Sequence, residues 1–224
     1  MFNVNFDFDY EKFRSTKKKE LHFTEPTRKK ILAACNELSK YSRFVINTPK
    51  LRSRIIKEYF GTIHEAKVNN QLILLNNVIN NSAKTVTFVD GSPRRVRVKV
   101  NPHNLDAPQT IMDKPYSKKV MARAGAWVHT LPGTGAARKP GEYHVGSGYR
   151  IIFGKGFSPA DPIFYNMGVV YHELTHKVLG TNDHCYGKAN SLGLKGTPRA
   201  IKNADNFNWF LQKFATEYKK GLRM

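Results

Sequence analysis

The chain begins with a regular alternation of apolar and polar residues. Every second residue is apolar, namely Phe2, Val4, Phe6, Phe8 and Tyr10. A period of two is typical of a strand that buries one face. We expect an edge strand packed on the domain, and the alternative is a segment that docks on a partner.

The period changes to that of helices after residue 23. Thr24, followed by Glu25 and Pro26, is a helix start signal. Beyond it, apolar residues recur every three or four positions at Ile31, Leu32, Cys35 and Leu38. A second helical region follows Pro49, breaks near Gly61, and resumes with Val68, Leu72, Leu75 and Ile79. We interpret these helices as scaffold.

The period returns to two beyond Lys84. TVTFVDG and RVRVKVN alternate on the two sides of a turn at Gly91, and AWVHTL and YRIIFG are further predicted strands. Between the last two lies LPGTGAARKPGEYHVGSG, whose glycine and proline content predicts a long loop at the border of a site. The order of helices, sheet and helices predicts an α+β fold with a small mixed or antiparallel sheet.

The last third of the chain contains a strongly apolar helix. Asp161 and Pro162 precede it, and we expect Asp161 to cap the helix and Pro162 to lie in its first turn. The next residues, IFYNMGVVYHELTHKVL, are apolar nearly all round, so this helix should be buried. A further helix should close the chain. We divide the sequence into an N-terminal extension, 1–23, with a lysine-rich linker, and a single domain, 24–224.

Composition adds the broad class and the charge. The chain has 224 residues, 40% of them hydrophobic, which is enough for one sizeable core. Lysine and arginine number 37 against 17 acidic residues, a net charge of +20, so the surface should attract polyanions. The two cysteines, Cys35 and Cys185, exclude a disulfide framework, and one bond between them is an open alternative. We find no signal-peptide pattern and no transmembrane segment.

The buried helix carries the first candidate chemistry. His172 and His176 lie four residues apart, so both imidazoles project from one face of the helix and can reach one ion. Glu173, beside the first histidine, is placed to take the proton of a water that attacks a carbonyl. Many HExxH matches are surface helices with ordinary salt bridges. A buried helix favours a metal site, because these polar side chains are unfavourable in an apolar helix unless they are satisfied.

A catalytic zinc site needs a third protein ligand. Gly180 is a natural end for the helix and lets the chain turn back toward the histidines. Asp183 and His184 both follow, and adjacent residues in an extended turn point in different directions, so we expect only one to bind. His184 comes twelve residues after His172, whereas the HExxHxxGxxH pattern requires ten, which argues against a metzincin.

The same stretch resembles a known family. HELTH, followed by Gly180 and Thr181, by Asp183 one residue further on, and by Tyr186, resembles the signature of the aspzincins, which are the deuterolysins and lysine-specific metalloendopeptidases. NADNFNWF, from Asn203 to Phe210, resembles a segment on the last helix of that family. The resemblance covers roughly residues 25 to 217.

The resemblance implies a zincin-like metallopeptidase. Zn²⁺ would be bound by His172, His176 and Asp183, with Glu173 as the general base and Tyr186 as a donor to the oxyanion. The alternative for Tyr186 is a tyrosine packed in the core. We expect His184 to line the cleft and Cys185 to serve in packing.

Asp205 is the candidate substrate-binding residue. In lysine-specific members of the family, acidic side chains in the S1′ pocket recognise lysine, and one of them lies in the segment that NADN resembles. A buried carboxylate favours an ammonium group. The family's second acidic residue is Asn208 in this chain, so we expect a preference for lysine at P1′ rather than strict specificity. The alternative is that Asp205 caps the last helix.

These observations predict a zinc-dependent endopeptidase, a hydrolase that acts on protein or peptide substrates. We expect a bacterial secreted toxin or effector, exported by a dedicated secretion system and acting outside the producing cell's cytoplasm, with a carrier or immunity protein as partner. One alternative is a hydrolase of peptidoglycan stem peptides that binds anionic cell-wall polymer. The other is a basic nucleic-acid-binding protein, suggested by Arg94, Arg95, Arg97 and Lys99, although no recognised nucleic-acid-binding motif accompanies them.

Overall fold

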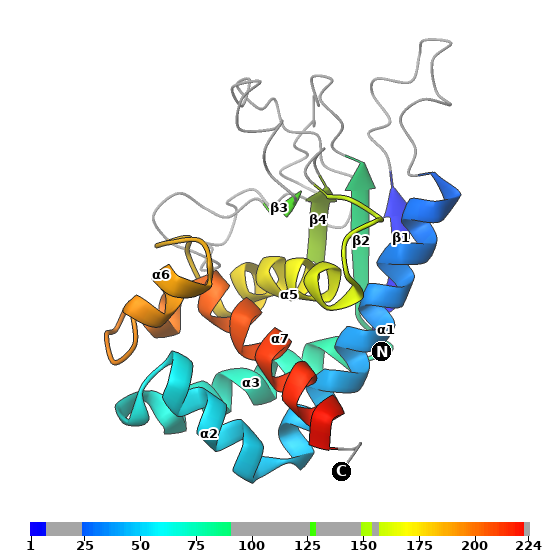
Figure 1. The fold of residues 1–224 in the computed structure, drawn as a ribbon. Coiled ribbons are helices and arrows are strands. Elements are labelled where there is room, and N and C mark those ends of the chain that lie inside the picture. The colour runs from blue at the N-terminus through cyan, green and yellow to red at the C-terminus, as the bar shows by residue number, and fades with distance from the viewer. Residues whose placement is uncertain (8–23, 91–125, 129–148, 154–156, 222–224) are drawn as a thin grey trace.

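A computed structural model describes residues 1–7, 24–90, 126–128, 149–153 and 157–221 of the chain. In this part a small sheet stands beside a group of helices (Figure 1). The RVRVKVN segment, the glycine-rich stretch before YRIIFG and the lysine run at 17–19 all lie outside the described residues.

Helices α1 (Glu25–Asn47), α2 (Pro49–Tyr59) and α3 (Glu65–Ile79) confirm the predicted helical N-terminal part. The hydroxyl of Thr24 accepts a hydrogen bond from the Thr27 amide and caps α1. The predicted break at Gly61 is real, with φ at 86°, and a short 3₁₀ helix, η3 (Thr62–His64), follows it. Gly61 is required there because a Cβ would come within 2.9 Å of the Gly196 Cα.

Within the described residues, the sheet has four strands in the order β1-β2-β4-β3. Their bounds are β1 (Asn3–Asp7), β2 (Thr85–Asp90), β3 (Ala126–Trp127) and β4 (Tyr149–Phe153). β1, β2 and β4 run parallel, and β3 is antiparallel to β4. The sheet is therefore mixed, as predicted, and β1 is an edge strand of its described part. Val4 pairs with Val86 and Phe6 with Phe88.

The strand pairing of β2 adds to what the sequence pattern predicts. The sequence places TVTFVDG and RVRVKVN on the two sides of a turn, and RVRVKVN lies outside the described residues, whereas β2 has a parallel neighbour on each side, β1 and β4. Alternation of apolar and polar residues predicts a strand but does not specify the strands with which it pairs. The proposed division at residue 24 stays a prediction, although β1 itself pairs within the sheet of the domain.

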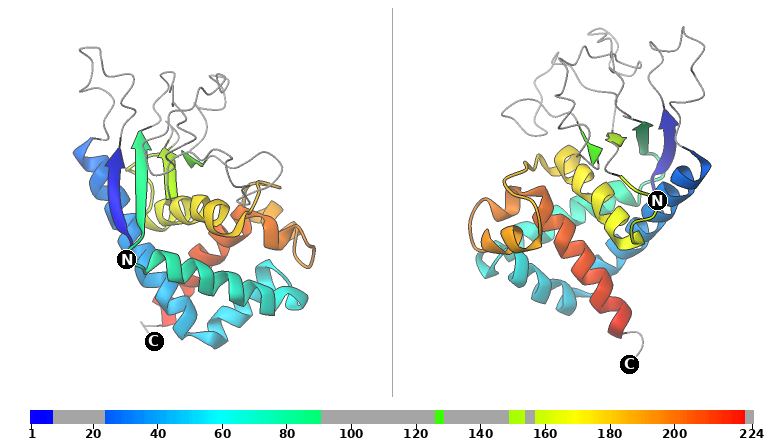
Figure 2. Two further views of the ribbon diagram at one scale, coloured as in Figure 1. Left: turned by 180° about the vertical axis from the view of Figure 1, so that it is seen from behind. Right: turned by 45° about the horizontal axis from the view of Figure 1, so that its top comes forward.

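The C-terminal half contains α5 (Ile163–Leu179), α6 (Lys188–Gly193), a 3₁₀ turn η4 (Ala200–Lys202) and α7 (Ala204–Gly221). Helix α5 is buried along most of its length, as predicted. Figures 1 and 2 show it between the sheet and the other helices. Pro162 is the residue before α5, and no side chain caps the helix, so the expected capping role of Asp161 is wrong. The backbone carbonyl of Asp161 instead accepts from the side-chain amide of Asn166.

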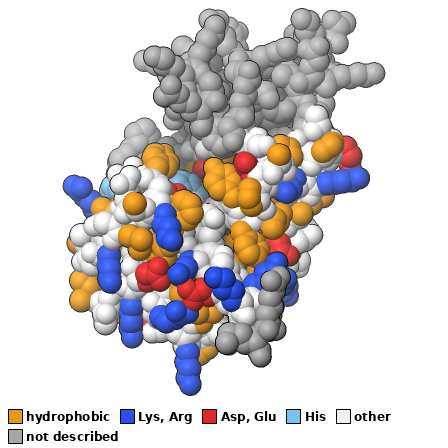
Figure 3. Space-filling model, viewed as in Figure 1, with side chains coloured by type: hydrophobic (Ala, Val, Ile, Leu, Met, Phe, Trp, Pro, Cys, Tyr) orange, Lys and Arg blue, Asp and Glu red, His pale blue; other side chains and the backbone are white. Residues whose placement is uncertain are grey.

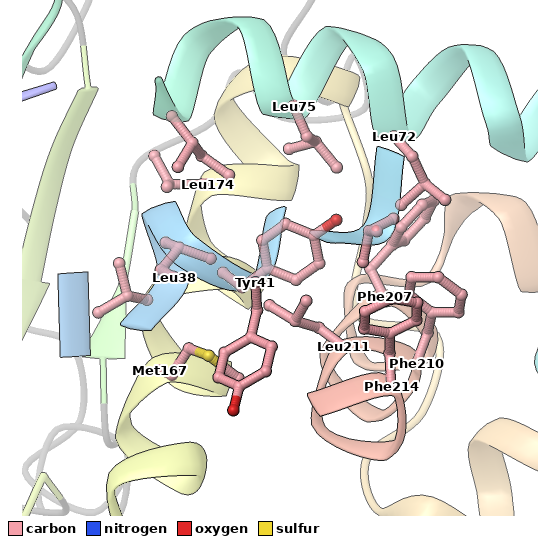
Figure 4. Packing of buried hydrophobic residues seen from close by; sticks show 14 of the residues in the cluster. Leu38, Tyr41, Leu72, Leu75, Met167, Leu174, Phe207, Phe210, Leu211 and Phe214 are labelled. Carbon is pink, nitrogen blue, oxygen red and sulfur yellow. The ribbon is translucent and has the colours of Figure 1, made fainter. Parts of the chain in front are cut away.

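The hydrophobic core lies where α1, α3, α5 and α7 meet (Figure 4). Its labelled residues are Leu38, Tyr41, Leu72, Leu75, Met167, Leu174, Phe207, Phe210, Leu211 and Phe214. All of them are at most 3% exposed. The core holds α5 and α7 firmly against each other, and these two helices supply most of the candidate site.

The described surface is rich in cations. Lysine and arginine side chains spread over the lower half of the face in Figure 3, with acidic side chains among them. No helix in the described residues has both the length and the apolar character needed to span a membrane.

Candidate metal centre

The two histidines of α5 face each other near the end of the helix. The Nε2 atoms of His172 and His176 are 3.2 Å apart, and both side chains are buried. Their spacing of four residues places them one turn apart on one face. The two imidazole rings therefore project toward a common point, as the sequence predicted.

The chain then turns back toward these rings. Gly180 ends α5 in the left-handed conformation, with φ at 68° and ψ at 34°. This turn brings Asp183 into the site, with its Oδ1 atom 3.0 Å from the Nε2 of His172 and 3.3 Å from that of His176. The three side chains offer ligand atoms within 4.8 Å of one another and could hold a metal ion. In the described residues, His184 does not belong to this group.

The outer nitrogen of each ring has its own partner. The Nδ1 of His176 lies 2.7 Å from the carbonyl oxygen of Thr181, which can only accept, so this nitrogen carries the proton. The Nδ1 of His172 lies 3.2 Å from Oδ1 of Asp205. In the neutral rings both Nε2 atoms then present lone pairs toward Asp183. Three acceptors that converge in this way require a cation between them, which is either a proton or a metal ion.

The charges around the two histidine rings also indicate that the site suits a cation. Burial lowers the pKa of His172, but hydrogen bonds to Asp183 and Asp205 outweigh this effect and raise it to about 10. Burial would raise the pKa of Asp183, but its hydrogen bonds to the two histidines hold the value well below the usual range. Without a metal, this site attracts a proton. Its negative charge suits a divalent cation.

Glu173 lies beside the candidate metal group and is 4% exposed. Burial raises the pKa of its carboxyl group, and the two neighbouring histidines reduce that rise only in part. A carboxylate with a raised pKa is a stronger base than one in water, which is the property that a general base needs.

Tyr186 lies beside His172. Their rings are nearly parallel, with centroids 6.2 Å apart, and Tyr186 is 63% exposed. Desolvation beside the site and the negative charge of Asp183 raise the pKa of Tyr186. The phenol therefore keeps its proton and remains a donor. Its exposure excludes the alternative of a tyrosine packed in the core.

Asp205, in the first turn of α7, lies directly behind His172. Its Oδ1 accepts from Asn208 in addition to the histidine, and its Oδ2 accepts from the Gly187 amide and the Trp209 indole. Burial would raise the pKa of Asp205, but these hydrogen bonds lower it, so the group stays ionised. None of its hydrogen bonds goes to the backbone of α7, which argues against the capping alternative.

The rest of the NADN segment holds the loop of the third candidate ligand. Asn203 Oδ1 accepts from the amides of His184 and Cys185, and Asn203 Nδ2 donates to Asn206. Asn206 in turn donates to the carbonyls of Tyr59 and Ser191. Both cysteines are free, which settles the open question of a disulfide.

Sequence reasoning missed the supporting contacts around the histidines. In the sequence analysis Thr181 was only one residue of the family signature, and no contact was predicted for it. In the structure its carbonyl orients His176, and its hydroxyl contacts that of Thr175. Asn208 and Trp209 were not recognised as partners of Asp205. These partners could have been sought from the sequence, because a metal-binding histidine almost always donates from its second ring nitrogen to a carboxylate or carbonyl.

Comparison with known proteins bears on the fold. No family model and no curated protein matches this sequence. A zinc peptidase from Grifola frondosa superposes with a TM-score of 0.51 at 17% sequence identity, over 85% of this chain and 97% of that chain. The chain has a zincin-like α+β fold. The predicted fold class is confirmed.

Proposed function

We propose that this protein is a zinc-dependent peptidase of the aspzincin type. The observation that carries the proposal is the convergence of two Nε2 atoms and one carboxylate oxygen within 4.8 Å, in a chain whose fold is that of a zinc peptidase. The matching signature, HELTH and GTNDHCYG, is independent support from the sequence.

The candidate ligands fit zinc better than harder cations. Two imidazoles and one carboxylate are a donor set of catalytic zinc sites, which leave one position open, whereas magnesium and calcium take oxygen ligands. In this proposal His172, His176 and Asp183 hold the ion. The chemistry that zinc supplies in such a site is polarisation of a carbonyl group and acidification of a water molecule.

The remaining side chains would carry the proton and the developing charge. Glu173 takes the proton of the attacking water and returns it to the leaving amine, for which its buried carboxylate is suited. Tyr186 donates to the negative charge that develops on the carbonyl oxygen of the substrate. This hydrogen bond strengthens only as the charge forms, so it lowers the barrier to reaction.

The substrate is a peptide or protein in this proposal. The preference for lysine at P1′ stays a prediction, and the contacts of Asp205 give that residue another task. Export as a toxin or effector, with a carrier or immunity protein, also stays a prediction. The net charge of +20 is the observation that keeps peptidoglycan stem peptides as a second candidate substrate.

Mass spectrometry of cleaved peptides tests the proposal. The protein, loaded with zinc, should cut peptides from casein, lose activity after chelation, and regain it when zinc is restored. Purified cell wall serves as the second substrate, since release of stem peptides without cleavage of casein would favour the wall-hydrolase alternative. Activity that chelation does not change would contradict the zinc-dependent reaction.

A further inference from the structure

All of the acceptor capacity of Asp205 is used inside the protein. The side chain is 8% exposed and receives four donors at 2.6–3.2 Å, two on each oxygen. A carboxylate has about four lone-pair sites. No site remains for the ammonium group of a substrate lysine. This arrangement is therefore unsuited to the recognition of lysine and suited to holding neighbours in place.

Two of the four donors lie on the same helix as Asp205 and fix its side chain. The other two lie on other segments, and the carboxylate fixes their position. Asn208 and Trp209 are one turn further along α7, so they fix the rotamer of Asp205 from its own helix. His172 and Gly187 belong to other segments. His172 is a candidate ligand on α5, and Gly187 directly follows Tyr186.

We propose that Asp205 is a positioning residue that sets the ring of His172 and the backbone next to Tyr186 in one arrangement. This inference rests on the proposed function. Through Oδ1 the carboxylate fixes which nitrogen of His172 is free to bind a metal. Through Oδ2 it fixes the end of the segment that carries Asp183 and Tyr186.

The support under Asp205 is rigid enough for this task. Asn206, its neighbour, is completely buried and joins α7 to the end of α2 and to α6 through the carbonyls of Tyr59 and Ser191. On the opposite side, α5 approaches so closely that a Cβ on Gly168 would lie 2.1 Å from Oδ1 of Asn208. A metal site built on such fixed elements keeps its geometry better than one built on loops.

The test is the substitution Asp205→Asn, measured by zinc affinity in a chelator competition and by the visible absorption of the cobalt-loaded protein. Loss of an outer-sphere partner of a ligating histidine typically weakens metal binding by about 10- to 100-fold. We expect the zinc affinity of Asp205→Asn to fall by about 10- to 100-fold. We also expect an altered absorption spectrum at saturating cobalt, because the ring of His172 is no longer held in one orientation.

The matched control is Glu217→Gln, the same change of carboxylate to amide on the same helix. Glu217 is paired with Arg54 and Lys213 at the surface. It should leave zinc affinity and the cobalt spectrum unchanged. This comparison separates a specific effect at the metal from a general weakening of α7, which would not alter the spectrum of the saturated protein.

Unchanged zinc affinity and an unchanged cobalt spectrum in a folded Asp205→Asn protein would overturn the inference. An altered P1′ preference would then assign Asp205 to substrate binding. If the variant does not fold, nitrogen NMR of the zinc-loaded wild type decides. We expect a slowly exchanging proton on Nδ1 of His172, and a proton on Nε2 would overturn the inference. A wild-type chain that binds no zinc would instead overturn the proposed function itself.

Discussion

His176 donates from Nδ1 to the carbonyl oxygen of Thr181 over 2.7 Å. Thr181 directly follows Gly180, so the residue that ends α5 also determines where the partner of this histidine lies. The left-handed conformation of Gly180 is thus connected to the orientation of a candidate metal ligand by one hydrogen bond.

Gly180→Ala should destabilise both the fold and the metal site. A Cβ in the left-handed conformation costs about 1–2 kcal/mol, so the free energy of unfolding in urea should fall by that amount. Zinc affinity should fall as well, because Thr181 shifts. Gly193→Ala is the control, since Gly193 lies in α6 and its added methyl group would meet no neighbouring side chain or segment within 4 Å. This control should be neutral or slightly stabilising. Equal stability of the two variants would refute this explanation of Gly180.

Gly168→Ala should disturb the contact between α5 and α7. The added Cβ would lie 2.1 Å from Oδ1 of Asn208. This side chain is held in place because its Nδ2 donates to Asp205 and its Oδ1 accepts from Gln212. Overpacking of this kind costs about 1–3 kcal/mol, which thermal or urea unfolding can measure. Adding Asn208→Ala should recover part of the loss. If the losses of stability from the two substitutions simply add, the added methyl group and the Asn208 side chain are not in contact.

The sequence predicted the helices, and it predicted candidate site residues that the structure brings together, because these signals are local. The period of α5, the four-residue spacing of its histidines and the stop at Gly180 are all contained in a short segment. The choice of Asp183 over His184 came from a resemblance, and the geometry brings Asp183 to the histidines.

Partners that are distant in sequence could not be predicted in the same way. The parallel pairing of β2 with β1 and β4 joins segments separated by long stretches of chain, and alternation carries no information about it. Asp205 meets His172 across 33 positions for the same reason. A carboxylate such as Asp205 could bind substrate, cap a helix or orient a histidine. Only the full set of its hydrogen-bond donors in the structure distinguishes these roles.

The two thiols should differ in reactivity. Cys35 is fully buried in α1, and burial raises the pKa of its thiol, so little reactive thiolate forms. Cys185 is only partly buried. We expect a thiol reagent to modify Cys185 alone in the native protein and both cysteines after denaturation, as peptide mass spectrometry would show. Modification of Cys35 at the same rate in the native state would be the contrary result.

Tyr186→Phe should lower the rate far more than the affinity. The loss of one oxyanion donor reduces kcat by about 10²- to 10³-fold, whereas substrate binding before the reaction uses the same bond only weakly. Zinc content should stay the same, since the phenylalanine ring can still lie beside His172. Steady-state kinetics on one cleaved peptide measures both quantities. A rise in KM at constant kcat would assign Tyr186 to substrate positioning.

The most direct test of the account compares the zinc-loaded wild type with Glu173→Gln on the same peptide, with zinc content measured on both samples. Glu173 is buried beside the candidate ligands without being one of them. We predict about one zinc per chain in both proteins and cleavage only by the wild type, because an amide cannot accept the proton of the attacking water. Near-native cleavage by a folded Glu173→Gln protein, or a wild type without zinc, would contradict the account.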